Sequence, residues 1–155
     1  MSHPQKITTF LWFDREAEEA ARLYCSIFER SRVVEVTPGP DGRAMSVVFE
    51  LEGQRFMALN GGPTYRFTPA ISLFVSVETQ QELDRIWEQL LAGGGAPTRC
   101  GWLTDRFGLS WQVIPTALME CLRGPDPAGS QRAVKAMLGM QKLDIAELRR
   151  AYAGT

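Results

Sequence analysis

Side chains suited to metal binding and acid–base catalysis are scarce in this 155-residue sequence. It contains one histidine, His3, and three cysteines. A metal centre built on imidazole ligands needs several histidines, so composition argues against a ligand set of that kind. Cys25, Cys100 and Cys121 are odd in number and lack CxxC spacing, which predicts free thiols rather than disulfides. The sequence therefore predicts no bound metal ion.

The usual arrangements for nucleophilic catalysis are also missing from the sequence. No GxSxG turn is present to hold a serine nucleophile, and no histidine is available as its base. Cys100 follows Arg99, whose charge favours a thiolate, although a small buried thiol at a strand end is the alternative. Asp105 is either a general base or part of a simple turn at 105–108. Both residues are weak catalytic candidates.

Glu50 is the third weak catalytic candidate. It lies between Phe49 and Leu51 on an expected strand, so alternation directs it away from the core. A half-exposed carboxylate at that place is either an acid–base group or the ion-pair partner of Arg43 or Arg55.

The glycine-rich segments do not match the turn that holds a nucleotide-type cofactor. Such a turn follows a strand and opens a helix, with an acidic residue later for the ribose. Gly93–Gly95 instead follows an expected helix, and Gly61-Gly62 is followed by Pro63 and another strand. The residues therefore predict no bound cofactor.

The segment Ala70–Leu91 organises the expected fold. Ile71–Val77 is rich in β-branched and aromatic residues, which predicts a strand. Thr79 precedes Glu82 by three residues, and this capping box predicts the start of a helix over Gln80–Leu91. Apolar residues at helical spacing then form one buried face, and three glycines end the helix.

The same plan occurs once earlier in the chain. Ile7–Phe13 predicts a strand, and Asp14 predicts the cap of a helix over about 15–28. When the two strands are superimposed, Phe10 falls on Phe74. The chain therefore contains two copies of one structural module.

Further strands follow each helix, and three helices are expected at the end of the chain. The expected strands are Arg32–Thr37, Arg43–Leu51, Gln54–Asn60, a short one near Pro97–Trp102, and Ser110–Ile114. The expected final helices are Ala117–Leu122, Gln131–Met140 and Ile145–Tyr152, the second preceded by an Asp126-Pro127 cap and the third by Asp144. This is an α+β fold of paired βαβββ modules with C-terminal helices. We expect one domain over 1–155, with module one at about 6–62, module two at about 69–115 and a helical tail at 116–155.

Alternation within Ile71–Val77 separates two faces of the expected sheet. Ile71, Leu73, Val75 and Val77 share the face that suits packing beneath the helix. Ser72, Phe74 and Ser76 share the other face, where polar and aromatic groups together are typical of small-molecule pockets.

Charge and hydropathy exclude several classes of partner. Seventeen basic and eighteen acidic residues give a net charge of −1, which favours neither nucleic acid nor anionic lipid. No apolar run approaches the roughly 20 residues of a membrane span, and the first residues contain no signal-peptide core. With its unpaired cysteines, the protein is expected to be cytoplasmic.

Four segments have a recognisable sequence: Phe10–Tyr24, Phe49–Pro63, Cys100–Thr116 and Lys142–Tyr152. They resemble the vicinal oxygen chelate superfamily of glyoxalases, bleomycin-resistance proteins and extradiol dioxygenases. Their sequences are most similar to those of the PhnB-like branch, known as 3-demethylubiquinone-9 3-methyltransferase. In metal-dependent members of the superfamily, ligands come from the first and last strands of each module. Those places fall near Thr8, Ser72, Met57 and Gln112, and none of these is His, Asp or Glu.

The resemblance implies a cleft lined by the modules, a small organic ligand and a homodimer. Aromatic side chains with neutral polar anchors suit a flat or amphipathic molecule, so we expect a metal-independent binding protein. The alternatives are an enzyme, either the methyltransferase or an isomerase or lyase, and an antibiotic-sequestering resistance protein. The expected ligand-binding residues are Thr8, Trp12, Met57, Asn60, Ser72, Phe74, Trp102 and Gln112.

Overall fold

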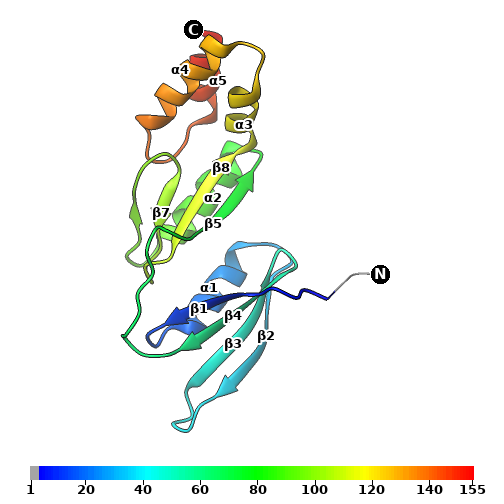
Figure 1. Ribbon diagram of the computed structural model, residues 1–155, viewed down its shortest axis with the longest axis vertical. Helices are drawn as coiled ribbons and strands as arrows, with labels where there is room; N and C mark the ends of the chain where they lie inside the picture. Colours follow the sequence, from blue (N-terminus) through cyan, green and yellow to red (C-terminus); the bar gives the residue numbers. More distant parts are fainter. Residues whose placement is uncertain (1–3) are drawn as a thin grey trace. The chain divides into compact units, whose positions relative to one another are not determined.

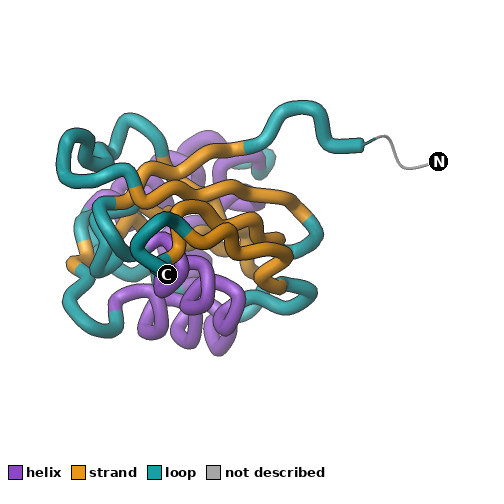
Figure 2. Tube along the Cα trace, turned by 90° about the horizontal axis from the view of Figure 1, so that it is seen from below, coloured by secondary structure: helices purple, strands orange, loops and turns teal. Residues whose placement is uncertain are grey.

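A computed structural model describes residues 4–155, and His3 lies outside this range. The chain forms two compact units that divide between Phe67 and Thr68. Figure 1 labels the elements, and Figure 2 distinguishes strands in orange from helices in purple. No described helix is long and apolar enough to cross a membrane.

The first unit contains one helix on one face of a four-stranded sheet (Figure 1). The strands are β1 (Thr9–Phe13), β2 (Arg32–Pro38), β3 (Ala44–Leu51) and β4 (Gln54–Asn60), in the order β1-β4-β3-β2. β1 is parallel to β4, and the other pairs are antiparallel. Helix α1 (Ala17–Ile27) buries Tyr24 against this sheet, where Phe49 and Phe56 are also buried.

The second unit repeats this topology. Its strands are β5 (Ser72–Val77), β6 (Ala96–Pro97), β7 (Trp102–Thr104) and β8 (Ser110–Pro115), in the order β5-β8-β7-β6. β5 is parallel to β8, as β1 is to β4. Phe10 lies beside Met57 in the first sheet, and Phe74 lies beside Gln112 in the second. The structure thus confirms the repeat and the predicted correspondence of Phe10 with Phe74.

Helix α2 (Gln80–Leu91) begins as the capping box predicts. The Thr79 side chain accepts a hydrogen bond from the Glu82 N–H at 3.1 Å. The predicted apolar face is buried through Leu83, Ile86, Trp87 and Leu90. The strand before the helix alternates as expected, except that Ile71 precedes β5 and is 69% exposed. The prediction that Ile71 packs beneath the helix is therefore wrong.

The start of helix α1 corrects the sequence prediction. The helix begins at Ala17 rather than Arg15, and the N-cap residue is Glu16 rather than Asp14. The Glu16 side chain makes no capping hydrogen bond, and the Asn60 Oδ1 atom accepts the Ala17 N–H at 2.8 Å instead. The cap comes from the end of β4 because β4 lies parallel to β1 and ends beside the first turn of the helix.

The short strand expected near 97–102 is two strands, β6 and β7, separated by a turn. Cys100 and Gly101 both have left-handed backbones, with φ of 57° and 85°. An extended strand cannot contain that geometry, so it breaks at these residues. The Thr98 N–H donates to the Trp102 carbonyl at 2.9 Å and closes the turn.

Three helices follow β8 in the second unit: α3 (Thr116–Arg123), α4 (Pro127–Leu138) and α5 (Ile145–Ala153). Asp126 and Asp144 cap α4 and α5 with their side chains, as predicted. The Gln80 side chain holds the segment before α5, because it donates to the Leu143 carbonyl and accepts the Ile145 N–H. The tail is thereby fastened to the first turn of α2.

Candidate functional site

Each sheet has one face beneath its helix, and most predicted ligand-binding residues lie on the opposite face. We call this the open face, although Ser110 and Ile114 are buried on that of the second sheet. On the second sheet, Gln112 of the inner strand β8 has Phe74 as its neighbour on β5 and Trp102 as its neighbour on β7. The Gln112 side-chain amide donates to the Ser72 hydroxyl at 3.0 Å. Phe74 is 56% exposed. The structure thus brings four of the predicted residues together.

On the open face of the first sheet, the place equivalent to Gln112 is apolar. Met57 lies on an inner strand between Phe10 of β1 and Val48 of β3, at the place that Gln112 has in the second sheet. Phe10 is 52% exposed, whereas Met57 is half-buried. Thr8 lies just before β1 and is half-buried as well. This face offers a thioether and an aromatic ring where the second offers an amide and a ring.

Contacts with the segment that follows β4 hold the Trp12 side chain in place. Its indole N–H donates to the Gly62 carbonyl at 2.9 Å, and its ring meets Tyr65 edge to face with centroids 5.0 Å apart. A Cβ atom at Gly61 would overlap the Trp12 ring, so only glycine fits there without displacement. The polar atom of Trp12 is therefore used within the first unit.

Asn60 has a structural role that sequence reasoning missed. Its Oδ1 atom caps α1 at Ala17, and its Nδ2 group donates to the Ala44 carbonyl at 2.9 Å. The oxygen and the nitrogen of the amide are therefore both hydrogen-bonded to backbone groups. These partners are 43 and 16 residues away, so no local pattern indicates them.

Glu50 forms ion pairs with two arginines on the open face of the first sheet. Its carboxylate lies 3.3 Å from Arg32 and 3.4 Å from Arg55. The predicted partner Arg55 is confirmed, and Arg32 replaces Arg43 because β2 places Arg32 directly opposite Glu50. Two cationic partners favour the ion-pair interpretation over an acid–base role.

Asp105 is a buried carboxylate at the turn between β7 and β8. One oxygen accepts the backbone N–H groups of Phe107 and Leu109 at 2.9 and 3.0 Å. The other accepts the indole N–H of Trp111 at 2.9 Å. Asp105 is only 3% exposed, so the turn interpretation explains its position.

The three cysteines are free thiols in the structure. Burial raises the pKa of Cys25, and the Arg22 charge opposes the shift only in part. Burial likewise raises the pKa of Cys121, so neither thiol is activated. Cys100 is half-buried, and its N–H donates to the Met140 carbonyl at 2.9 Å. No group of three or more His, Cys, Asp or Glu residues within 4–155 is arranged to hold a metal ion.

The places where metal-dependent relatives carry ligands do not fit a divalent cation in this chain. Met57 supplies a thioether, which hard cations disfavour. Ser72 and Gln112 are neutral and hydrogen-bonded to each other. Neutral oxygens without a carboxylate or imidazole do not replace the hydration shell of such an ion.

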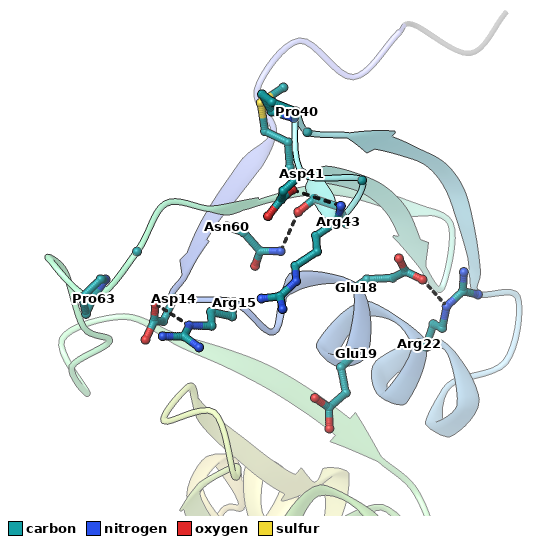
Figure 3. A pocket seen from close by; sticks show the side chains of 15 residues that line it. Asp14, Arg15, Glu18, Glu19, Arg22, Pro40, Asp41, Arg43, Asn60 and Pro63 are labelled. Carbon is teal, nitrogen blue, oxygen red and sulfur yellow. Dashed lines mark hydrogen bonds and ion pairs between the residues drawn. The ribbon is translucent and has the colours of Figure 1, made fainter.

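A groove that sequence reasoning missed lies in the first unit, at the start of α1 (Figure 3). We call it the α1 groove; its volume is about 1130 Å³. It is bounded by α1, by the β2–β3 turn and by the residues after β4. The lining residues are Asp14, Arg15, Glu18, Glu19, Arg22, Gly39–Met45, Asn60, Gly62 and Pro63. A cluster of charges at the β1–α1 junction and in the Pro-Asp-Gly-Arg turn was the available signal.

A family model described as 3-demethylubiquinone-9 3-methyltransferase matches residues 5–114. The chain belongs to this family. A Bacillus cereus structure described as a PhnB protein of the same name is 36% identical, with a TM-score of 0.67. That match covers 72% of this chain and 99% of the B. cereus chain. The predicted family and α+β fold are confirmed, and the segment Lys142–Tyr152 lies outside the residues that the family model matches.

Two more distant structures share the fold alone. Protein PA1353 from Pseudomonas aeruginosa is 20% identical with a TM-score of 0.59, and the match covers 72% of this chain and 98% of that one. The fosfomycin resistance protein FosX from Listeria monocytogenes is 13% identical with a TM-score of 0.52, covering 74% and 94%. Among curated proteins, none matches this chain.

Proposed function

We propose that this family member binds a small organic molecule on the open faces of its sheets, without a metal ion. The observation that carries the proposal is the exposed ring of Phe74 beside the hydrogen-bonded pair Ser72 and Gln112. An aromatic ring more than half exposed next to oriented neutral polar groups is typical of a ligand-contacting surface. Trp102 on the other side of Gln112 extends the same surface.

The ligand class follows from the chemistry of the two faces. Phe10 and Met57 offer apolar and polarisable contacts, and Gln112 offers an amide that can donate and accept. Glu50 is paired with two arginines, so its carboxylate is not free to select a cation. The groups around Gln112 on the second sheet, which are Ser72, Phe74 and Trp102, are uncharged. We therefore propose an uncharged aromatic or amphipathic ligand with at least one hydrogen-bonding group.

The proposal extends to assembly and location. We propose a homodimer, supported by the exposed Met119 and Leu122 on the C-terminal helix α3. Light scattering coupled to size exclusion tests this, and a monomer at micromolar concentration contradicts it. A cytoplasmic location is supported by three free cysteines. The charge balance supports neither nucleic acid nor membrane as a partner.

The test is a thermal-shift screen of the full chain against aromatic metabolites and antibiotics, with divalent metals in parallel. A ligand that binds the native state raises the melting temperature by mass action. Phe74→Ala should abolish most of the shift. Leu138→Ala is a matched control, because Leu138 is also 56% exposed but lies at the end of α4. Equal shifts in both variants, or stabilisation only by a metal, would contradict the proposal.

A second candidate is methyl transfer, which the description of the family favours. The same screen includes S-adenosylmethionine as a probe. Stabilisation by this methyl donor that survives Phe74→Ala would favour the enzyme over the binding protein. Mass spectrometry of a phenolic acceptor incubated with protein and donor would then detect the added methyl group.

A further inference from the structure

The α1 groove carries three arginines and four carboxylates, and most of these charges are already satisfied within the first unit. Arg22 lies 3.0 Å from Glu18 in a pair one helical turn apart. The Asp41 carboxylate accepts the backbone N–H of Arg43 at 3.0 Å, which fixes the turn between β2 and β3. These groups shape the groove but have little charge left to offer a ligand.

Arg43 is the cation that remains available in the groove. Its side chain extends from the β2–β3 turn toward α1 and ends between Arg15 and Glu18 (Figure 3). Its guanidinium makes no hydrogen bond or ion pair with any residue that the structure describes. A planar group with five donors, directed into a groove and left without an acceptor, is suited to bind a carboxylate.

Asp14 is a groove carboxylate that, among the described residues, only a long, exposed ion pair holds. It lies at the β1–α1 junction, across the groove from the β2–β3 turn (Figure 3). Its ion pair with Arg15 spans 3.9 Å between two substantially exposed side chains. An exposed pair at that distance contributes little stability, so a ligand cation can replace it at small cost.

We propose that the α1 groove binds a small zwitterion, with Arg43 contacting its carboxylate and Asp14 its ammonium group. A simple anion would satisfy Arg43 but would meet the surplus of carboxylates in the groove. A simple amine would gain nothing from Arg43, whose positive charge repels it. Only a molecule with both charges satisfies both residues, which is the basis of its selection.

The position of the groove in the fold also suits a ligand. The parallel strands β1 and β4 both end there, and α1 begins there. The carboxyl ends of parallel strands are a frequent place for ligands in open sheets. The groove is large enough for a small molecule, and its lining residues are not those of the open faces. This inference therefore goes beyond the proposed function.

The experiment uses the ¹⁵N-labelled full chain and a series of ω-amino acids from glycine to 6-aminohexanoate. The series varies the separation of the two charges, and affinity should peak at the length that matches Arg43 and Asp14. Saturable shifts are expected in the amides of 14–19 and 39–43. Acetate and propylammonium, each with one of the two charges, should bind far more weakly.

Variants then identify the residues. Arg43→Gln and Asp14→Asn should each weaken the best zwitterion by roughly tenfold or more, and Arg43→Lys should fall between Arg43→Gln and the parent. Arg66→Gln, an exposed arginine of the same unit outside the groove, should have no effect. No saturable shift with any zwitterion, or acetate binding as tightly as the best one, would overturn the inference. Phe74→Ala should leave zwitterion binding unchanged. Failure of the zwitterion proposal is therefore distinguishable from failure of the proposed function.

Discussion

Replacing Asp105 with alanine tests whether this carboxylate organises a turn or serves as a base. The substitution removes the acceptor of three hydrogen bonds, from Phe107, Leu109 and Trp111. The bonds from Leu109 and Trp111 are buried, so those two donors would have no access to water. A buried donor without a partner costs about 1–3 kcal/mol, and two give a loss of roughly 2–6 kcal/mol.

That loss is a large fraction of the stability of a small protein, and it is measurable by thermal unfolding. For a chain of this length, a loss of 1 kcal/mol lowers Tm by about 2–4 °C. The middle of the range, about 4 kcal/mol, therefore predicts a fall in Tm of roughly 8–16 °C. Tryptophan fluorescence follows the transition, because Trp87, Trp102 and Trp111 all lie in the second unit.

Asp105→Asn is the matched variant. Its remaining oxygen still accepts from Phe107 and Leu109, but an amide N–H would then meet the indole N–H of Trp111. We expect a loss of about 1–3 kcal/mol from this one unsatisfied contact. Trp111→Phe in the same background should recover part of it in a double-mutant cycle.

A Tm within about 3 °C of the parent for Asp105→Ala would refute this reasoning. It would mean that the turn is held by other contacts and that the buried carboxylate serves another purpose. The general-base interpretation of Asp105 would then regain support.

Two further predictions concern the first unit and the tail. Gly61→Ala should lower the free energy of unfolding by about 1–3 kcal/mol, because the added Cβ overlaps the Trp12 ring. Gly39→Ala is the control and should cost less, because the neighbours of a Cβ there lie at 3.5 Å. Equal urea midpoints for the two variants would contradict the predicted overlap. Burial raises the carboxyl pKa of Asp84, but hydrogen bonds from Gln80 and Lys142 and the Lys142 charge outweigh it, so the pKa is lowered from 3.8. Its stabilising contribution is therefore present above pH 3.8 and is lost as the pH falls below that value, and Asp84→Asn should flatten the urea midpoint over this acidic range. An unchanged acid slope in that variant would contradict the assignment.

Local and periodic signals predicted the parts of the fold that depend on near neighbours. The Thr79 cap, the buried face of α2 and the repeat of Phe10 in Phe74 need only sequence spacing, and the structure confirms them. Pairing register followed from the repeat, because a strand that must bury one face admits few alternatives. The repeat also predicted that Ser72 and Gln112, both neutral, occupy the equivalent places on their strands.

The errors involve partners distant in sequence or unusual backbone geometry. The capping of Ala17 by Asn60 spans 43 residues, and the pairing of Arg32 with Glu50 depends on a bulged register between β2 and β3. The left-handed Cys100 breaks a strand although the residue is not a glycine, and only the following Gly101 hinted at a turn. The α1 groove was missed because it joins residues of three separate segments, none of which has a motif.

The two sheets keep one backbone plan but change the chemistry at equivalent places. Phe10 and Phe74 are both about half exposed on their open faces, so the aromatic contact is retained in both units. Their inner-strand neighbours differ, since Met57 cannot orient a hydrogen bond whereas Gln112 is held by Ser72. We therefore expect the second sheet to hold a polar ligand group through Gln112, and the first sheet to offer apolar and polarisable contacts at the equivalent place. The repeat keeps the backbone geometry, and the change from methionine to glutamine decides which sheet can form a directed hydrogen bond with a ligand.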